Sequence, residues 1–452
     1  MKSNKLQLIA VALLFSGSIH AQQAEANLPN KVHRFSLQDA LAYAEKNNAQ
    51  VKNALLDIKL QEQVNREVTG MAYPQIDAVG QLTYNAKLPI SLVPAEFFGG
   101  QQGEYARLAF GVKWNSTGGV SLSQILFDGQ VFTGLQARKT LIDFQEKNTE
   151  LTKENIRANI TKIYYQLVVS KKQLALIDSN ITMINKLQHD TKIMYDNGFA
   201  EGLDIDRQNV TLANLQSAKT KALTQVSNGY LGLKVLMGMP VQEELILMDE
   251  LTDEKIREGV LEAMNYAYEQ RRDYQLAALG VKLNEYDIQR YKYSKIPQLS
   301  LSGYYNEMAQ SDKFNLFFGS AYWSPVSAIS LNLRIPIFTG FATNAKIAQA
   351  NIKLRQAQNN IEMLKLNIDQ EVKTAVNNYK AAVQDMDYQN SNMALAQKVY
   401  NQTKKKYEIG TGSQIEVNQA RIELETAQTN YFNALYTAVI AKIDFLKATG
   451  KL

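Results

Sequence analysis

Residues 341–409 read FATNAKIAQANIKLRQAQNNIEMLKLNIDQEVKTAVNNYKAAVQDMDYQNSNMALAQKVYNQTKKKYEI, and this stretch decides the fold of the chain. It holds neither proline nor glycine, the two residues that most often end a helix. Apolar residues recur in it every seven positions. Such a repeat keeps one face of a helix against a partner helix, as in a coiled coil. The first row is Ile347, Leu354, Ile361 and Ile368, and the second is Val372, Tyr379, Met386, Met393, Tyr400 and Tyr407.

A tight turn follows this stretch. In YEIGTGSQIEV, residues 407–417, Gly410 and Gly412 interrupt the helical pattern, which resumes at Ile415 and continues to Gly450. A helix that spans residues 341–409 reaches roughly 100 Å, at about 1.5 Å per residue. The sequence therefore predicts a long helical hairpin with a tight tip.

The first half of the chain repeats the second. Tyr195, Gly198, Leu203, Asp204 and Gly238 match Tyr407, Gly410, Ile415, Glu416 and Gly450 at an offset of 212. Ala40, Tyr43, Ala44, Pro74 and Gln75 match Ala263, Tyr266, Ala267, Pro297 and Gln298 at an offset of 223. Phe127 and Gly129 match Phe338 and Gly340 at an offset of 211. So many matches in one order indicate an internal duplication. We predict one repeat over residues 22–238 and a second repeat over 261–452. The long helices of both repeats are expected to pack side by side into a tube, and residues 239–260 are expected to form a connector on its outside.

Each repeat also contains amphipathic strands. A helix with Ser36 as its N-cap is expected to run to Val68, before the first strand. A long loop rich in proline, glycine and aromatic residues, from Leu88 to Thr117, separates the first strand from the second. Alternation of apolar and polar side chains suits a wall between lipid and water, and it suits a half-exposed soluble sheet equally well. The four strands are expected at residues 74–84, 120–127, 297–305 and 329–335.

The start of the chain has the pattern of a secretory signal peptide. Lys2 and Lys5 precede an apolar run, and cleavage is expected after Ala21, so residues 1–21 are the predicted signal peptide. A buried N-terminal helix is the alternative. Without these two lysines the formal charge falls from +5 to +3, which is too small and too scattered to indicate a nucleic-acid partner. The chain has no cysteine, which excludes disulfides, thiolate zinc sites, cysteine nucleophiles and an acylated N-terminal cysteine.

No catalytic constellation is evident. His33 and His189 have no metal-ligand spacing and are expected to be ordinary surface residues. Asp204 and Asp206 lack the concave pocket that paired catalytic carboxylates need. The glycine-rich segments GFAEGLD and GTGSQ lack the lysine of a phosphate-binding loop. We therefore predict that the protein is not an enzyme and that it has no catalytic residues, no cofactor and no metal site.

In this order, and twice over, these elements resemble the TolC-like outer-membrane efflux protein family. The resemblance covers essentially the whole chain after the signal peptide. The stretches that carry it are YPQIDAVG (73–80) with IPQLSLSG (296–303), SLSQILFDG (121–129) with LNLRIPIFTG (331–340), and YDNGFAEGLDIDR (195–207) with YEIGTGSQIEVNQ (407–419).

The resemblance implies a mainly α-helical fold with a β-barrel part. The duplicated long helical hairpins are expected to form an α-barrel that extends into the periplasm. Each chain is expected to contribute four transmembrane β-strands to a twelve-stranded barrel, in a homotrimer set in the lipid of the cell outer membrane. Four strands are too few to close a barrel, because known barrels begin at eight, so several chains must contribute.

The implied function is a passive exit duct of a tripartite efflux pump or a type I secretion system. Its partners would be a periplasmic adaptor (a membrane fusion protein) and an inner-membrane pump. The alternative is a periplasmic coiled-coil adaptor, or a structural protein without a pore. An adaptor would need one helical hairpin between two lipoyl-like β halves, whereas this sequence predicts two hairpins and four amphipathic strands.

The resemblance also assigns roles to the two hairpin tips. The tips are expected to dock the adaptor, although turn formation alone would also explain their glycines. Tyr407 and Asp204 match a tyrosine–aspartate contact that helps to hold the periplasmic entrance closed, and Gly412 replaces the arginine that reinforces it. Glu416 matches a ring of carboxylates at the entrance, and Gln419 replaces its acidic companion. The docking residues are Gly198, Gly202, Leu203, Gly410, Gly412, Ser413 and Ile415, and the entrance residues are Asp204, Tyr407, Glu416 and Gln419.

Overall fold

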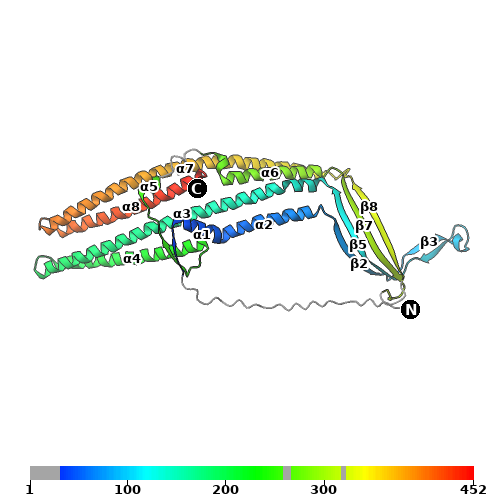
Figure 1. The fold of residues 1–452 in the computed structure, drawn as a ribbon, viewed down its shortest axis with the longest axis horizontal. Helices are drawn as coiled ribbons and strands as arrows, with labels where there is room; N and C mark the ends of the chain where they lie inside the picture. The colour runs from blue at the N-terminus through cyan, green and yellow to red at the C-terminus, as the bar shows by residue number, and fades with distance from the viewer. Residues whose placement is uncertain (1–30, 258–265, 317–321) are drawn as a thin grey trace.

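The computed structural model describes residues 31–257, 266–316 and 322–452. The predicted signal peptide, residues 1–21, and the repeat residue Ala263 lie outside the described residues. The molecule is elongated, with long helices along one axis and a β-sheet at one end (Figure 1). The tips of both long helical hairpins lie at the opposite end from the sheet (Figure 1).

Two helical hairpins form the long part of the molecule. The first consists of α3 (Gly129–Asp196) and α4 (Gly202–Met237), and the second of α7 (Ala342–Glu408) and α8 (Gln414–Ala448). The predicted hairpin after residue 340 is therefore confirmed. Its heptad row is the packed seam, because Met386 is fully buried and every other member of the row is buried or half-buried.

The helix predicted from Ser36 to Val68 is two helices. They are α1 (Leu37–Asn47) and α2 (Ala49–Gly70). Ser36 is the N-cap of α1 as predicted, and Asp39 completes a capping box with it. The break falls at Asn48, whose side-chain oxygen accepts hydrogen bonds from the next two free backbone amides, Gln50 N at 2.7 Å and Val51 N at 3.1 Å.

The corresponding helix of the second half, α6 (Arg272–Tyr293), has 22 residues, as does α2. In both halves this helix stacks end to end on the returning arm of the hairpin. The Asn48 amide donates to Leu236 O, in the last turn of α4, at 2.6 Å. At the corresponding joint the Arg271 guanidinium donates to Ala448 O, the last residue of α8, at 2.9 Å. Each donor satisfies a carbonyl that the end of a helix leaves without a partner.

The sheet contains four antiparallel strands in the order β2-β5-β7-β8. All four predicted strands are present, and three of them are longer than expected. A bulge lies between Ile125 and Phe127 in β5. The strands are β2 (Gln75–Tyr84), β5 (Trp114–Phe127), β7 (Gln298–Ser311) and β8 (Trp323–Arg334).

The loop predicted from Leu88 to Thr117 is not irregular. It contains a short antiparallel hairpin of β3 (Ile90–Pro94) and β4 (Tyr105–Ala109), with a 3-10 turn, η1 (Ala95–Phe98), between them. Its last residues belong to β5. The prolines and glycines that suggested a loop lie at the ends and in the turn of this hairpin, where they do not interrupt strand pairing.

A small assembly of elements joins the halves near the middle of the long axis (Figure 1). The strand β1 (Val32–Phe35) pairs in parallel with β6 (Glu244–Leu247), and α5 (Asp253–Arg257) follows. The buried Tyr164 hydroxyl in α3 donates to Phe35 O at 3.1 Å and accepts from Asp249 N at 3.2 Å. The main buried apolar cluster lies here, between both hairpins and this connecting layer. A short 3-10 turn, η3 (Tyr268–Gln270), precedes α6.

Candidate functional site

The two hairpin tips are tight turns that require glycine at specific positions. Gly198 and Gly410 have φ of 83° and 76°, a left-handed conformation that other residues adopt at a cost. A Cβ on Gly412 would lie 3.1 Å from Tyr407 N, so the backbone there is also tightly packed. A Cβ on Gly202 would meet only the Tyr195 ring, at 3.6 Å. Turn geometry therefore explains three of the four predicted tip glycines and not Gly202.

The carboxylates predicted at the entrance lie in the first turns of the returning helices. Asp204 is half-buried at the start of α4 and forms an ion pair with Arg207 at 3.8 Å. Glu416 is exposed in the first turn of α8, and its backbone N–H donates to the N-cap Ser413 hydroxyl at 3.3 Å. A negative charge is favourable at both positions because of the helix dipole. Gln419, one turn on, is exposed and donates to Glu423 at 2.9 Å.

Tyr407 joins the two hairpins, but through a different partner from the one the resemblance implies. Its hydroxyl donates to the Sδ atom of Met194 in α3 at 3.4 Å. Within the described residues, it makes no hydrogen bond to Asp204. Burial and the nearby Asp204 charge raise the pKa of Tyr407, so the hydroxyl remains a donor at neutral pH.

Sequence reasoning missed a buried polar layer beneath the tips. The Gln208 side chain in α4 is 1% exposed and donates to the Thr191 hydroxyl in α3 at 2.8 Å. Gln414, the first residue of α8, is 7% exposed, and neither amide atom finds a partner among the described residues. Glutamine is common in these helices, so nothing in the sequence singled out these two positions.

The tips also present exposed apolar side chains. Leu203 and Ile415, which were predicted as docking residues, are 54% and 65% exposed. Phe199 and Ile409, which were not predicted, are 82% and 73% exposed. Apolar groups gathered at one end of an elongated molecule are typical of a surface that binds another protein.

The sheet at the other end has one apolar and one polar face. Ile76 in β2, together with Ile329 and Leu331 in β8, lies on the apolar face with 64–83% of its surface exposed. Among the described helices, none packs against either face of the sheet (Figure 1). An apolar surface left uncovered in this way needs an apolar environment. The polar face carries Gln75, Asp77, Ser121, Ser123, Ser300, Ser302, Ser330 and Asn332.

Aromatic residues gather at both ends of this sheet. At the end far from the helices, the Trp114 ring lies 4.6 Å from Tyr84 and 4.7 Å from Phe314. At the end near the helices, Phe127 packs against Phe132, and Phe338 packs against Phe341, both at 5.5 Å. The strands have 10–14 residues, and strands of at least about ten residues with aromatic residues at both ends have the pattern of membrane-spanning β-strands.

Other sites of chemical interest are few. The prediction that His33 is a surface residue is wrong, because this side chain is 9% exposed and pairs with Glu243 at 2.7 Å between β1 and the connector. His189 is exposed, as predicted. No group of three or more histidine or acidic residues that could hold a metal lies within the described ranges. In the same ranges, every helix is too short or too polar to span a bilayer.

An amphipathic sheet that is continued by two long helical hairpins defines the fold of an outer-membrane channel. The model of the family described as "Outer membrane efflux protein" matches residues 263–451. The outer membrane efflux protein BepC of Brucella suis biovar 1 is 22% identical over 452 residues, 99% of this chain and 90% of that protein. The outer membrane protein TolC of Salmonella enteritidis is 20% identical over 468 residues, 100% of this chain and 87% of that protein.

The fold agrees with these relatives. The crystal structure of the outer membrane protein VceC from Vibrio cholerae superposes with a TM-score of 0.69 over 92% of this chain and 96% of that one, at 15% identity. Residues 263–451 thus match the outer membrane efflux protein family, and the whole chain is similar to TolC-like members of it. The chain is an efflux channel of the outer membrane, and channels of this family are transport proteins without enzymatic activity.

Proposed function

We propose that the chain works as a homotrimeric exit duct. In this role it conducts substrates passively from a periplasmic adaptor and an inner-membrane pump, or a type I secretion apparatus, to the outside. The observation that carries this proposal is the open four-stranded sheet. Its apolar face needs lipid, and its two edge strands, β2 and β8, have backbone groups that are not paired within the described chain.

A trimer satisfies those edges. Unpaired backbone groups are costly inside a membrane, so the sheet must close against further strands. Four strands per chain are half of the smallest barrel, whereas three chains together supply twelve. In such a barrel β2 of one chain pairs with β8 of the next, and the polar face that includes Asp77 and Asn332 lines the water-filled interior.

The tips are the proposed docking surface for the adaptor. Leu203 and Ile415 are exposed beside the turn glycines, and Phe199 and Ile409 extend the same apolar surface. An amphipathic helical hairpin of an adaptor would bury these side chains in a helix-in-groove contact. Because Gly202 has no steric need to be glycine, close approach of the adaptor backbone is a reason for its presence.

The entrance is the proposed gate. Glu416 is exposed near the turn, where three copies would surround the axis of a trimer. With Gln419 in place of a second acidic residue, the ring would hold one carboxylate per chain. The link from Tyr407 to Met194 supports a role for Tyr407 in holding the second hairpin against the first. A thioether is a weaker acceptor than a carboxylate, so this latch would be a weak one.

Crosslinking through engineered cysteines tests the assembly and the docking together, because the chain has no cysteine of its own. Asp77→Cys in β2 combined with Ser330→Cys in β8, both on the polar face, should give a covalent trimer in outer membranes, whereas either single variant should stay monomeric on denaturing gels. A photo-crosslinker at Ile409 should capture an adaptor, and one at exposed Tyr388, away from the tip, should not. Absence of the trimer in several registers of the β2–β8 pair would contradict the duct.

A further inference from the structure

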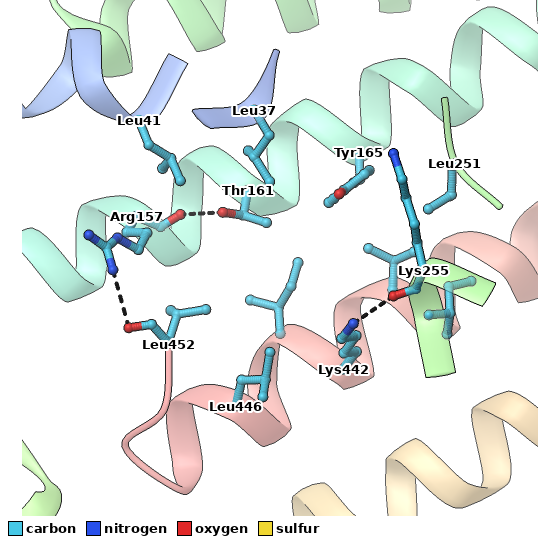
Figure 2. A pocket seen from close by; sticks show the side chains of 13 residues that line it. Leu37, Leu41, Arg157, Thr161, Tyr165, Leu251, Lys255, Lys442, Leu446 and Leu452 are labelled. Atoms are coloured by element: carbon cyan, nitrogen blue, oxygen red, sulfur yellow. Dashed lines mark hydrogen bonds between the residues drawn. The ribbon is translucent and has the colours of Figure 1, made fainter. Parts of the chain in front are cut away.

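A pocket of about 230 Å³ lies where both hairpins meet the connecting layer. Figure 2 shows Leu37 and Leu41 of α1 on one side, and Leu446 and Leu452 at the end of the chain on the other. The residues that line it come from α1, α3, α5, α8, the segment just before α5 and the segment after α8. Anything bound there touches both halves of the molecule.

The interior of the pocket is apolar and large enough for a small organic molecule. Leucine, isoleucine and valine side chains make up most of its lining. An apolar protein cavity of about 150 Å³ stays dry and binds benzene. A space of about 230 Å³ therefore accommodates a body larger than one aromatic ring.

Polar groups at this pocket favour a particular end group on the ligand. Tyr165 of α3 lines the pocket and is half-buried, and its hydroxyl makes no hydrogen bond within the described part of the chain. The lining also contains three basic side chains, Arg157, Lys255 and Lys442, and no acidic one. Glu45 pairs with Arg157 at 3.1 Å and Asp249 lies 4.0 Å from Lys255, and both carboxylates are outside the lining.

These groups are held in place by the surrounding backbone. Lys442 donates to Lys255 O at 2.6 Å, which joins α8 to α5, and the Lys255 ammonium donates to Glu250 O at 3.1 Å. Burial and the Asp249 charge raise the pKa of Tyr165, so its hydroxyl stays protonated and can donate. An apolar pocket with a few fixed polar groups is the usual form of a small-molecule site.

We propose that this pocket binds a small amphiphilic anion, with an apolar body of about two fused rings or an equivalent alkyl chain. The body lies among Leu37, Leu41 and Leu446, and the anionic end accepts from Tyr165 and lies beside Lys255. Such a ligand bridges the first hairpin, the connector and the second hairpin, so its binding stabilises the joint between the halves by mass action. This site does not depend on a trimer or on an adaptor.

Cysteine protection tests the site in the purified full-length chain. Leu41→Cys places the only thiol of the protein in the pocket, and Leu446→Cys is a second reporter from the opposite wall. The probe is 1-naphthoate, with 1-naphthylmethanol and 1-naphthylmethylammonium as neutral and cationic analogues. Small ligands gain about 0.3 kcal/mol of binding free energy per heavy atom, which for naphthoate corresponds to a Kd of about 1 mM.

At about 5 mM, naphthoate should slow alkylation of the engineered thiol in Leu41→Cys or Leu446→Cys by a small maleimide about sixfold. This factor equals one plus the ratio of the naphthoate concentration to its Kd. The neutral analogue should protect less and the cation least. Ile409→Cys at the tip is the matched control, and its reaction rate should not change. Adding Tyr165→Phe or Lys255→Gln to a reporter should raise the naphthoate Kd severalfold while the rate without probe stays the same.

Equal protection by all three analogues would overturn the anion preference. Slowing in the Ile409→Cys control as well would show a general effect of the probe and would overturn binding at this pocket. If both reporters are unreactive without probe in a folded protein, the pocket is covered and the proposal fails.

Discussion

Replacing Arg271 with alanine removes the side chain that joins α8 to α6. The Arg271 side chain is 9% exposed, and its guanidinium donates to Asp273 at 2.7 and 3.1 Å, to Glu371 at 2.7 Å and to Ala448 O at 2.9 Å. Removing one partner of a buried ion pair costs about 3–5 kcal/mol. The carboxylates here are 28% and 47% exposed, and water takes the place of part of the lost interaction. We therefore expect a loss of about 2–4 kcal/mol at this joint.

Hydrogen exchange measures that loss locally. At about 1.4 kcal/mol per factor of ten, amides in the first turn of α6 and the last turn of α8 should exchange roughly 30- to 700-fold faster. Arg271→Lys keeps the charge but not the planar guanidinium, so its exchange rates should fall between those of the wild type and of Arg271→Ala. Asn48→Ala is the matched control, because it should loosen the α4–α2 joint and leave α6 and α8 unchanged. Unaltered exchange at α6 in Arg271→Ala, or a uniform increase along the whole chain, would refute this account of the joint.

Three further predictions concern buried, entrance and titrating residues. Met386→Asp buries a charge in the fully buried heptad row and should destabilise the second hairpin by several kcal/mol, seen as a lower Tm; an unchanged Tm would place the row in solvent. Glu416→Gln should abolish cation preference and multivalent-cation block in single-channel recordings with little change in Tm, whereas a purely capping role predicts lower Tm and unaltered selectivity. Hydrogen bonds from Tyr266 and Tyr268 hold the pKa of Asp369 below its usual range, so Asp369→Asn should lower Tm at pH 7 and lose this effect as the pH falls below about 4; a difference that persists at about pH 2 would contradict the assignment.

The sequence was most informative where one physical requirement repeats along the chain. Many residues contribute to the heptad row around Met386, and many contribute to the constant offset that matches Gly198 with Gly410. The heptad row lies along one long helix, and the two matched glycines have the same left-handed conformation at the two tips. The strands were equally clear because alternation fixes which face each side chain occupies. These patterns survive the loss of any single residue.

Features that depend on one side chain could not be predicted in this way. Asn48 divides a helix because its amide meets the end of α4, a contact between residues 188 positions apart. His33 is buried because β1 pairs with β6, and a four-residue strand gives no periodic signal. The Tyr407 hydroxyl donates to Met194 and not to the nearby Asp204, because side-chain packing between the hairpins decides its hydrogen-bond partner.

Electrical recording in planar lipid bilayers tests the central claim, that this chain is an outer-membrane channel, most directly. Purified protein added to one side should insert and produce discrete current steps of uniform size, with a cation preference that depends on Glu416. A pore built from an amphipathic sheet predicts that these steps disappear when Ile329→Asp and Leu331→Asp place charges on the apolar face, because such strands cannot enter lipid. Folded wild-type protein that is recovered without detergent and passes no current at any voltage would contradict the account.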